Sequence, residues 1–447
     1  MDDITRQAKN EVTAMIKKDP GHALTLLQNM LQKKSVNPWF SSNYPQGEEE
    51  AQAVVEEEMR RLGAEVRLWE PSAENLKEYA NGPGYYADHK FDHRPNLAAF
   101  LRGSQKHGHS LLLLGHIDVV EPGDNWTVPP FSGEIKEGKI YGRGAADMKG
   151  GLAAQIAALG YIKRAGYRLK GDVIVGSVVD EEAGGMGTLA FVAEGYRSDA
   201  AIIGEPTNLV VAPLCRGILW GKITIPGRNS HIELPQTNWR AGGGVDAIEK
   251  AKLYLEHIDH LNHEWEICKK HPLMDIPCQI KVAMINAGDY PTTYASKAEI
   301  VVNIQYLPSE KDENGLGGKV KSQIEDWVKK IAATDDWLSE HPPIIEWMID
   351  ANCGETPETH PVVTILAENI RAVRPKVGTD VIKGVHCHTD MGFLTDRNIP
   401  TVNFGPGMLT VCHQPDEHIE VADYLEAVEI MAGTIIDWCG AEVDDGV

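Results

Sequence analysis

Side chains able to do metal chemistry collect at the end of one apolar run. The run 111–114 has the length and hydrophobicity of a buried strand, and His116 and Asp118 follow it two residues apart. Alternation along an extended chain places both side chains on the same side of the strand end. An imidazole with a carboxylate beside it is the usual pairing of a metal ligand and the group that orients it. The spacing therefore predicts a metal-binding position here.

Asp147 lies at a second junction of this kind. It ends the turn-like sequence GRGAAD and leads into MKGGLAAQIAAL, which has helical character. Open α/β sheets place their ligands at such junctions, outside the carboxyl ends of the strands. Asp147 is therefore a candidate for the same site.

Further acids and a histidine follow other short apolar runs or turns. In chain order they are Asp180-Glu181-Glu182, Glu205 and His413. The ligand set formed by His116, Asp147, Glu182, Glu205 and His413 offers two imidazoles and three carboxylates. It suits two divalent ions, Zn²⁺ first with Co²⁺ or Mn²⁺ as alternatives, bridged by one carboxylate and sharing a water. Glu181 is an extra carboxylate outside this ligand set, and a hydrolase needs such a group as the general base that activates the water.

Five motifs resemble the family of acetylornithine deacetylase, succinyl-diaminopimelate desuccinylase and carboxypeptidase G. They are HID at 116–118, GRGAADMKGG at 142–151, DEEAGGMGT at 180–188, GEPT at 204–207 and the C-terminal GPG…CHQPDE. The motifs keep the family's order with suitable spacing, and the resemblance runs from about residue 20 to 440. It implies a di-zinc catalytic domain interrupted by a lid domain that also mediates dimerisation.

The resemblance implies a role for each position. Asp147 would bridge the two ions. His116 and Glu205 would bind one ion, and Glu182 and His413 would bind the other. Glu181 would be the general base, and Asp118 would orient His116.

One further role lies in the inserted segment. Gly227-Arg-Asn-Ser-His231 resembles the family's G-x-x-[AS]-H. His231 would then reach the neighbouring subunit's site and stabilise the oxyanion of the tetrahedral intermediate. Without the family context, the same residue would be an ordinary surface histidine.

The positions expected to contact substrate depart from the family pattern. Gln305 stands where relatives often carry an arginine, and an amide pairs less well with a carboxylate than a guanidinium does. The substrate would therefore lack an α-carboxylate or use another arginine, for which Arg216 and Arg240 are candidates. Gly405, in the Gly-Pro-Gly turn, is a further candidate substrate contact.

The elements that must position these residues change character along the chain. Up to about residue 214, strands alternate with helices, which predicts an α/β domain; 96–102 and 110–114 are expected to be neighbouring strands. The later segments follow the β-α-β-β-α-β order of a ferredoxin-like unit: 217–225, 243–261, 279–287, 299–307, 319–333 and 344–347. The resemblance makes the first domain zinc-peptidase-like, with a mixed sheet covered by helices. The expected organisation is 1–214 catalytic, 215–350 inserted α+β lid and dimerisation domain, and 351–447 catalytic.

Composition excludes several classes of partner. The formal net charge of −22 would repel nucleic-acid phosphates. Seven scattered cysteines without a CxxC motif indicate reduced thiols rather than a disulfide framework. With no signal-peptide pattern and no run approaching a membrane span, the expectation is a cytoplasmic protein without membrane contact.

The leading functional hypothesis is a homodimeric zinc amidohydrolase that removes a small acyl group from an amino acid or related amine. A dipeptidase or carboxypeptidase would use the same residues, because attack on an amide carbonyl is the same reaction in both. A non-catalytic dimeric binding protein would be favoured by a missing ligand or base, and the sequence lacks neither.

Overall fold

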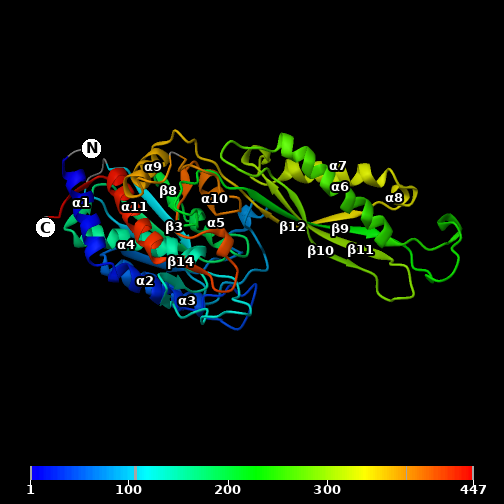
Figure 1. Ribbon diagram of the computed structural model, residues 1–447, viewed down its shortest axis with the longest axis horizontal. Helices are drawn as coiled ribbons and strands as arrows, with labels where there is room; N and C mark the ends of the chain where they lie inside the picture. Colours follow the sequence, from blue (N-terminus) through cyan, green and yellow to red (C-terminus); the bar gives the residue numbers. More distant parts are fainter. Residues whose placement is uncertain (1–2, 105–107, 379, 445–447) are drawn as a thin grey trace. The chain divides into compact units, whose positions relative to one another are not determined.

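The computed structural model describes residues 3–104, 108–378 and 380–444, which form two compact units (Figure 1). The first unit, which we call the catalytic unit after the role that the sequence predicts for it, comprises Met1–Cys215, Gly354–Val385 and Thr389–Val447. The inserted unit comprises Arg216–Cys353 with His386–His388. The second unit is thus an insertion in the chain of the first.

A mixed sheet organises the catalytic unit. Its strand order is β1-β2-β7-β3-β8-β13. In chain order the strands are β1 (Glu65–Trp69), β2 (Asn96–Leu101), β3 (Leu111–His116), β7 (Val173–Val178), β8 (Ala200–Ile203) and β13 (Thr401–Asn403). Strands β7, β3, β8 and β13 run parallel, whereas β1 and β2 pair antiparallel at one side. Because the parallel strands share one direction, β3, β7 and β8 deliver their following residues to the same edge.

The expectation that β2 and β3 are neighbours is wrong, because β7 lies between them. Every residue of β7 is buried, as suits a central strand covered on both faces. The last residues of β2, by contrast, are half-buried. Proximity in the sequence suggested that β2 pairs with β3. The structure instead places β7 between them, where this apolar strand is buried on both faces.

Helices cover both faces of this sheet. A Cβ on Gly115 of β3 would meet Leu152 of α4, whereas Gly176 of β7 faces Leu114 and Phe191 of α5, so α4 and α5 lie on opposite faces. The helices are α1 (Asp3–Lys18), α2 (Gly21–Leu31), α3 (Gly47–Arg61), α4 (Gly150–Arg164), α5 (Met186–Ala193), α9 (Pro361–Val373), α10 (Met391–Thr395) and α11 (Val421–Cys439). Short helical turns are η1 (Lys77–Tyr79), η2 (Ala145–Lys149) and η5 (Leu409–Val411).

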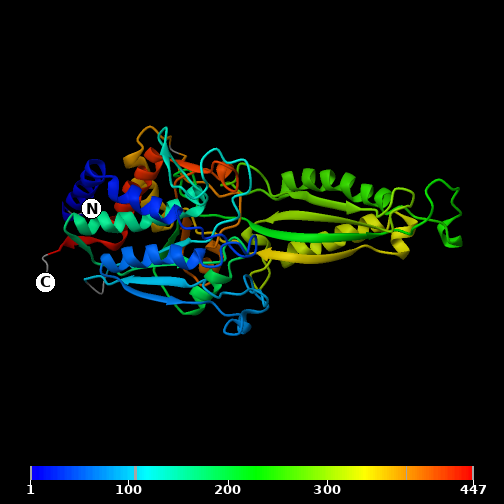
Figure 2. The ribbon, with the colours of Figure 1, turned by 90° about the horizontal axis from the view of Figure 1, so that it is seen from below.

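Smaller sheets complete the catalytic unit. They join β14 (His418–Glu420), β5 (Lys139–Tyr141) and β4 (Ile135–Lys136) in one group, and β15 (Ala441–Val443) with β6 (Tyr167–Leu169) in another. Helix α1 packs on α11 and β15, so the two ends of the described chain meet (Figure 1 and Figure 2).

The inserted unit has the ferredoxin-like topology that the sequence predicts. Its antiparallel strands lie in the order β10-β11-β9-β12, and Figure 1 shows its helices on one face of the sheet. The elements are β9 (Gly217–Pro226), η3 (Trp239–Ala241), α6 (Ala247–Cys268), β10 (Ile280–Ala287), β11 (Lys297–Tyr306), η4 (Pro308–Glu310), α7 (Gly318–Ala332), α8 (Asp336–Glu340) and β12 (Ile344–Ala351). The predicted α/β class with an inserted α+β domain is confirmed. Across residues 3–104, 108–378 and 380–444, no helix combines the length and apolar character needed to cross a bilayer.

Candidate metal centre

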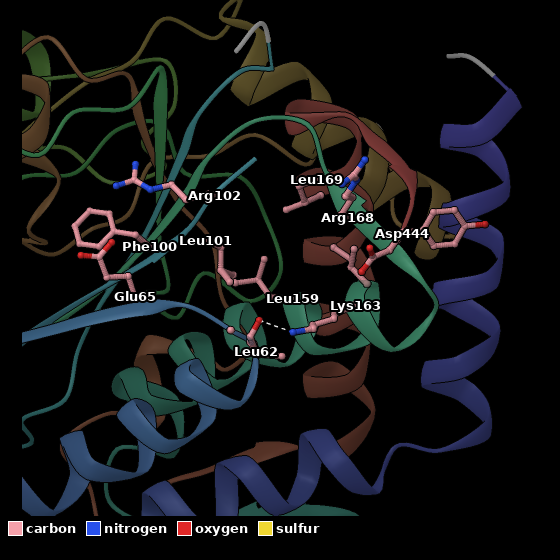
Figure 3. Close-up of a pocket in the computed structure, with 13 residues that line it drawn as sticks. Leu62, Glu65, Phe100, Leu101, Arg102, Leu159, Lys163, Arg168, Leu169 and Asp444 are labelled. Atoms are coloured by element: carbon pink, nitrogen blue, oxygen red, sulfur yellow. Dashed lines mark hydrogen bonds between the residues drawn. The ribbon is translucent and has the colours of Figure 1, made fainter. Parts of the chain in front are cut away.

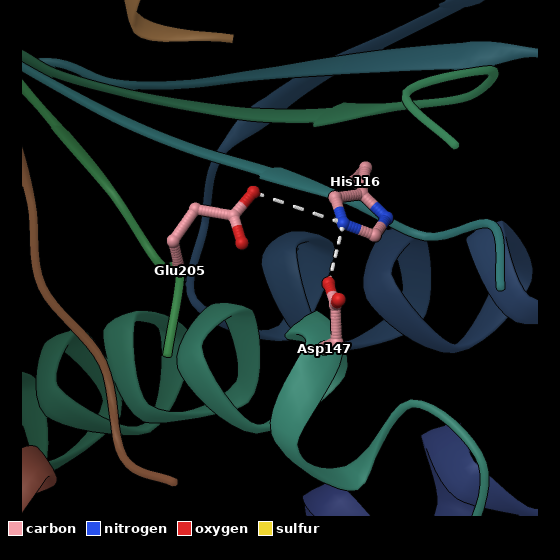
Figure 4. A group of neighbouring side chains, drawn as sticks. All are labelled: His116, Asp147 and Glu205. Carbon is pink, nitrogen blue, oxygen red and sulfur yellow. Dashed lines mark hydrogen bonds and ion pairs between the residues drawn. The ribbon is translucent and has the colours of Figure 1, made fainter. Parts of the chain in front are cut away.

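Three side chains from separate elements converge beyond the end of β3. His116 is the last residue of β3, Asp147 lies in η2, and Glu205 follows β8; Figure 4 shows the three pointing toward one another. Nε2 of His116 lies 3.1 Å from Oδ1 of Asp147 and 3.8 Å from Oε1 of Glu205. Their ligand atoms all lie within 4.8 Å of one another, a spacing that one cation can span.

A second group shares Asp147. Nε2 of His413 lies 3.3 Å from Oδ2 of Asp147 and 3.2 Å from Glu182. The ligand atoms of these three residues again lie within 4.8 Å of one another. The side chain of His413 is 50% exposed and that of Glu182 only 6%, so the pair opens to solvent on the histidine side. The two oxygens of Asp147 thus face different histidines, as a bridging carboxylate would require.

Asp118 connects the first group to Glu181. Nδ1 of His116 donates to the backbone carbonyl of Asp118 at 2.9 Å and lies 3.5 Å from its carboxylate. The same carboxylate accepts the backbone N–H groups of Glu181 and Glu182, each at 3.3 Å. Oε2 of Glu181 lies 3.8 Å from Nε2 of His116. Asp118 therefore holds both the histidine and the loop that carries the predicted general base.

Buried residues behind this loop were not predicted from sequence. Asn37 donates to the carboxylates of Asp118 at 2.8 Å and Asp180 at 3.3 Å. Arg94 donates to Asp180 at 2.8 Å and also to Glu48. All of these side chains are at most 5% exposed. Asn37, Glu48 and Arg94 belong to no short motif, and only the fold brings them to Asp118 and Asp180.

A second unpredicted pair fixes the backbone of the bridging residue. Glu417 accepts the N–H groups of Ala146 at 2.9 Å and Asp147 at 3.1 Å. Its other oxygen pairs with Arg143, and both side chains are at most 1% exposed. Arg143 lies in the motif GRGAAD and Glu417 in CHQPDE. Their place in these motifs was the sequence feature that could have identified them.

The electrostatics of the cluster reflect burial of many carboxylates together. Burial raises the pKa of Glu181 well above its usual range, and burial with the nearby charge of Asp147 does the same for the pKa of Glu205. Hydrogen bonds to Asp147 and Glu182 raise the pKa of His413 to about 11. The pKa of Asp147 is lowered, because its hydrogen bonds to His116 and His413 outweigh the opposing effect of burial.

The residues fit divalent cations. Imidazole and carboxylate donors suit borderline ions such as Zn²⁺, Co²⁺ and Mn²⁺. Cationic charge at the centre would remove the repulsion among the buried carboxylates, and the histidines would bind in their neutral form. Among the residues that the structure describes, His116, Asp147, Glu182, Glu205 and His413 supply two such ligand groups.

Predicted substrate and oxyanion residues lie partly outside this cluster. Arg216, 2% exposed, donates to Gln305 at 2.8 Å and to the carbonyl of Ile276, all within the inserted unit. His231 is exposed in the same unit, where its Nδ1 accepts from the N–H of Glu233. Gly405 lies in the catalytic unit, and a Cβ there would come within 2.4 Å of the Gly204 carbonyl. Gly405 thus packs closely against the backbone of the segment that carries Glu205. The substrate and oxyanion roles of Arg216, His231 and Gly405 remain predictions.

A cavity of about 340 Å³ lies at the opposite end of the sheet (Figure 3). Leu101 of its wall pairs with Val173, the first residue of β7, whereas His116 pairs with Val178 at the last. Its wall combines aliphatic, aromatic and charged side chains, and Lys163 there donates to the carbonyl of Leu62 at 2.7 Å. No histidine or cysteine is among the described residues that line it.

Comparisons with known proteins agree with the geometry. Residues 112–437 match the sequence profile of peptidase family M20/M25/M40. The chain is similar to the N-formyl-4-amino-5-aminomethyl-2-methylpyrimidine deformylase of Halalkalibacterium halodurans, with 29% identity over 96% of this chain and 97% of that protein. It is 31% identical to the acetylornithine deacetylase of Proteus mirabilis, over 78% of this chain and 83% of that protein.

Solved structures agree in fold. A tripeptidase from Staphylococcus aureus subsp. aureus Mu50 superposes with a TM-score of 0.69, covering 93% of this chain and 97% of that one at 19% identity. At that identity the likeness shows the fold alone. The family resemblance read from the sequence motifs is confirmed.

The contact between Arg143 and Glu417 yields a stability prediction. At pH 8.5, above the pKa of about 7 to which burial raises Glu417, replacing either partner leaves a buried charge unpaired. Arg143→Met and Glu417→Gln should each lower the free energy of unfolding in urea by about 3 kcal/mol or more. The double variant should lose clearly less than the sum of the two.

The ion pair of Arg164 with Asp19, which is partly exposed, provides the control. Arg164→Met should cost at most about 1 kcal/mol. Strictly additive losses for Arg143 and Glu417 would contradict the pairing.

Proposed function

The chain belongs to peptidase family M20/M25/M40 and is a metallohydrolase of amide bonds, and from this premise we propose that it removes a short acyl group from an amine. The first candidate substrate is N-formyl-4-amino-5-aminomethyl-2-methylpyrimidine, or a closely similar formamide. The second is an N-acyl amino acid. Two divalent ions, Zn²⁺ first, are proposed as cofactors.

The observation that carries this proposal is the pair of ligand groups sharing Asp147 with Glu181 beside them. Two divalent ions held there would polarise the amide carbonyl and lower the pKa of an attacking water. A structural metal site is closed and needs no carboxylate beyond its ligands. A hydrolytic site needs one more, as the general base for the attacking water.

Protein groups then divide the proton chemistry among them. Glu181 takes a proton from the attacking water and returns it to the leaving amine, so that acid and base are one residue. Asp118 keeps the loop of Glu181 in place by accepting its N–H. His231 of a neighbouring subunit is proposed to donate to the developing oxyanion.

A formamide without a carboxylate is favoured over an acylated amino acid by two observations. The deformylase relative aligns over almost the whole of both chains. In addition, the guanidinium of Arg216 is buried and already donates to Gln305 and Ile276, which leaves it poorly placed to hold a substrate carboxylate.

The acylated amino acid stays as the second candidate because the acetylornithine deacetylase relative is 31% identical. A dipeptidase or carboxypeptidase would use the same Glu181 and metal ligands. Amine release from a substrate panel decides among the three.

The zinc-loaded protein should release amine from the formylated aminomethylpyrimidine faster than from N-acetylornithine, N-succinyl amino acids or dipeptides. Glu181→Gln should lower kcat by about a thousandfold or more, since general-base action and water activation are lost together, while bound metal is unchanged. Kinetics and elemental analysis of the same samples measure both.

Glu194→Gln provides the matched control, because Glu194 lies at the end of α5 and pairs with Arg67 at the surface. It should leave kcat unchanged. Full activity of Glu181→Gln would contradict the general-base role, and faster turnover of dipeptides would move the proposal to a peptidase.

A homodimer through the inserted unit is the proposed assembly. Strand β10 is an edge strand, and its Met284 and Ile285 are 63% and 54% exposed. A long apolar edge strand in water is a template for pairing with another chain. A second copy of this chain, aligned edge to edge, would cover it.

Paired substitutions Met284→Lys and Ile285→Lys should therefore convert the dimer into a monomer, measured by light scattering after size exclusion. Ile267→Lys, on α6 and 81% exposed, should leave the dimer intact. A monomeric wild-type chain, or a dimer that survives both lysines, would contradict this interface.

A further inference from the structure

Three aromatic side chains beside the Glu181 loop have no part in the proposed proton chemistry. The imidazole of His89 stacks on Tyr86 with centroids 4.7 Å apart and planes 20° from parallel. The indole of Trp39 also lies beside this imidazole, with ring centroids 5.3 Å apart and planes tilted by 43°. We call Trp39, Tyr86 and His89 the aromatic cluster.

The cluster contacts the catalytic loop directly. Nδ1 of His89 lies 2.8 Å from the carboxylate of Asp180, the residue immediately before Glu181. Tyr86 covers Gly184 of the same loop, where a Cβ would come within 2.5 Å of the phenol oxygen. Both rings are therefore held by the short segment that presents the general base.

Trp39 is anchored at its backbone to the metal centre. Its N–H donates to Oδ1 of Asn37 at 3.0 Å. The amide nitrogen of that Asn37 donates to Asp118, which holds His116 and the Glu181 loop. The backbone of Trp39 is thus linked, through Asn37 and Asp118, to the groups proposed to bind metal and position the base.

The indole nevertheless remains 58% exposed. An aromatic ring whose backbone is hydrogen-bonded and which packs beside a second ring, with most of its surface in water, is preorganised to bind a flat partner. Stacking of a heteroaromatic base on an aromatic side chain strengthens binding in single-stranded nucleic-acid complexes.

We propose that Trp39 is a specificity-determining residue that stacks on a flat, amino-substituted heteroaromatic ring carried by the leaving amine, with His89 and Tyr86 positioning it. The inference rests on the proposed function, because it assumes that the scissile formamide lies beside Glu181. It adds which part of the substrate this chain reads: the ring of the amine, rather than a carboxylate.

The test compares a ring-bearing and a ringless substrate. Turnover of N-formyl-4-amino-5-aminomethyl-2-methylpyrimidine and of N-formylbutylamine is measured for the zinc-loaded wild type, Trp39→Ala and Trp39→Phe. Trp39→Ala should lower kcat/KM for the pyrimidine about tenfold or more, chiefly through KM, and change that for the butylamine less than twofold. Trp39→Phe should recover much of the loss, because a ring is restored.

Equal losses for both substrates, or no loss for either, would overturn the stacking role. If Trp39 only stabilised the fold, its loss would lower kcat/KM for both substrates. The ratio of the two kcat/KM values therefore separates a stacking role from a structural one. Because the indole is exposed, the alanine variant is expected to fold.

A second measurement is independent of turnover. Calorimetry follows binding of the amine product, 4-amino-5-aminomethyl-2-methylpyrimidine, to wild type and Trp39→Ala. Weaker binding to the variant supports the subsite even if neither formamide is hydrolysed, an outcome that would overturn the proposed function alone. Equal binding, or no binding to the wild type, overturns the subsite.

Discussion

Burial of several carboxylates in one place is the constraint on which the rest of this structure depends. The side chains of Asp118, Asp147, Glu181, Glu182 and Glu205 are all at most 15% exposed, and they lie around two imidazoles. Each charge taken out of water costs several kcal/mol unless something compensates it. The fold compensates with backbone N–H groups, histidines and, in this account, divalent cations.

The architecture of the catalytic unit follows from that need. Parallel strands β3, β7 and β8 end at one edge of the sheet, so that short loops bring His116, the Asp180–Glu182 segment and Glu205 together without long detours of the chain. The buried carboxylates would repel one another, and the chain offsets this repulsion with hydrogen-bond donors held in fixed positions. Asn37 and two backbone N–H groups satisfy Asp118, while Glu417 holds the backbone of Asp147. The contacts that stabilise this region are therefore the same ones that position the proposed metal ligands.

Much of this arrangement can be predicted from the sequence, because it depends on local patterns. Apolar runs ending in His or acid indicate strand ends, and strand ends of one parallel sheet share an edge. The ferredoxin-like insertion also follows from the order of its elements.

The remaining features depend on contacts between distant residues. Nothing local in the sequence marks Asn37 or Arg94, which reach Asp180 across 143 and 86 positions. The placement of β7 between β2 and β3 likewise follows from burial of the whole sheet rather than from chain order. The pairing of Arg216 with Gln305 was also outside prediction, although both residues were singled out for another role.

The central claim is that two ligand groups sharing Asp147 hold two divalent ions on which amide hydrolysis depends. Titrating metal-free protein with Zn²⁺, with calorimetry and elemental analysis read beside amine release, tests it most directly. The account predicts two ions bound per chain, hydrolysis that requires them, and fewer bound ions in Asp147→Asn. Full activity in the metal-free protein, or a single ion bound with Asp147→Asn indistinguishable from wild type, would contradict it.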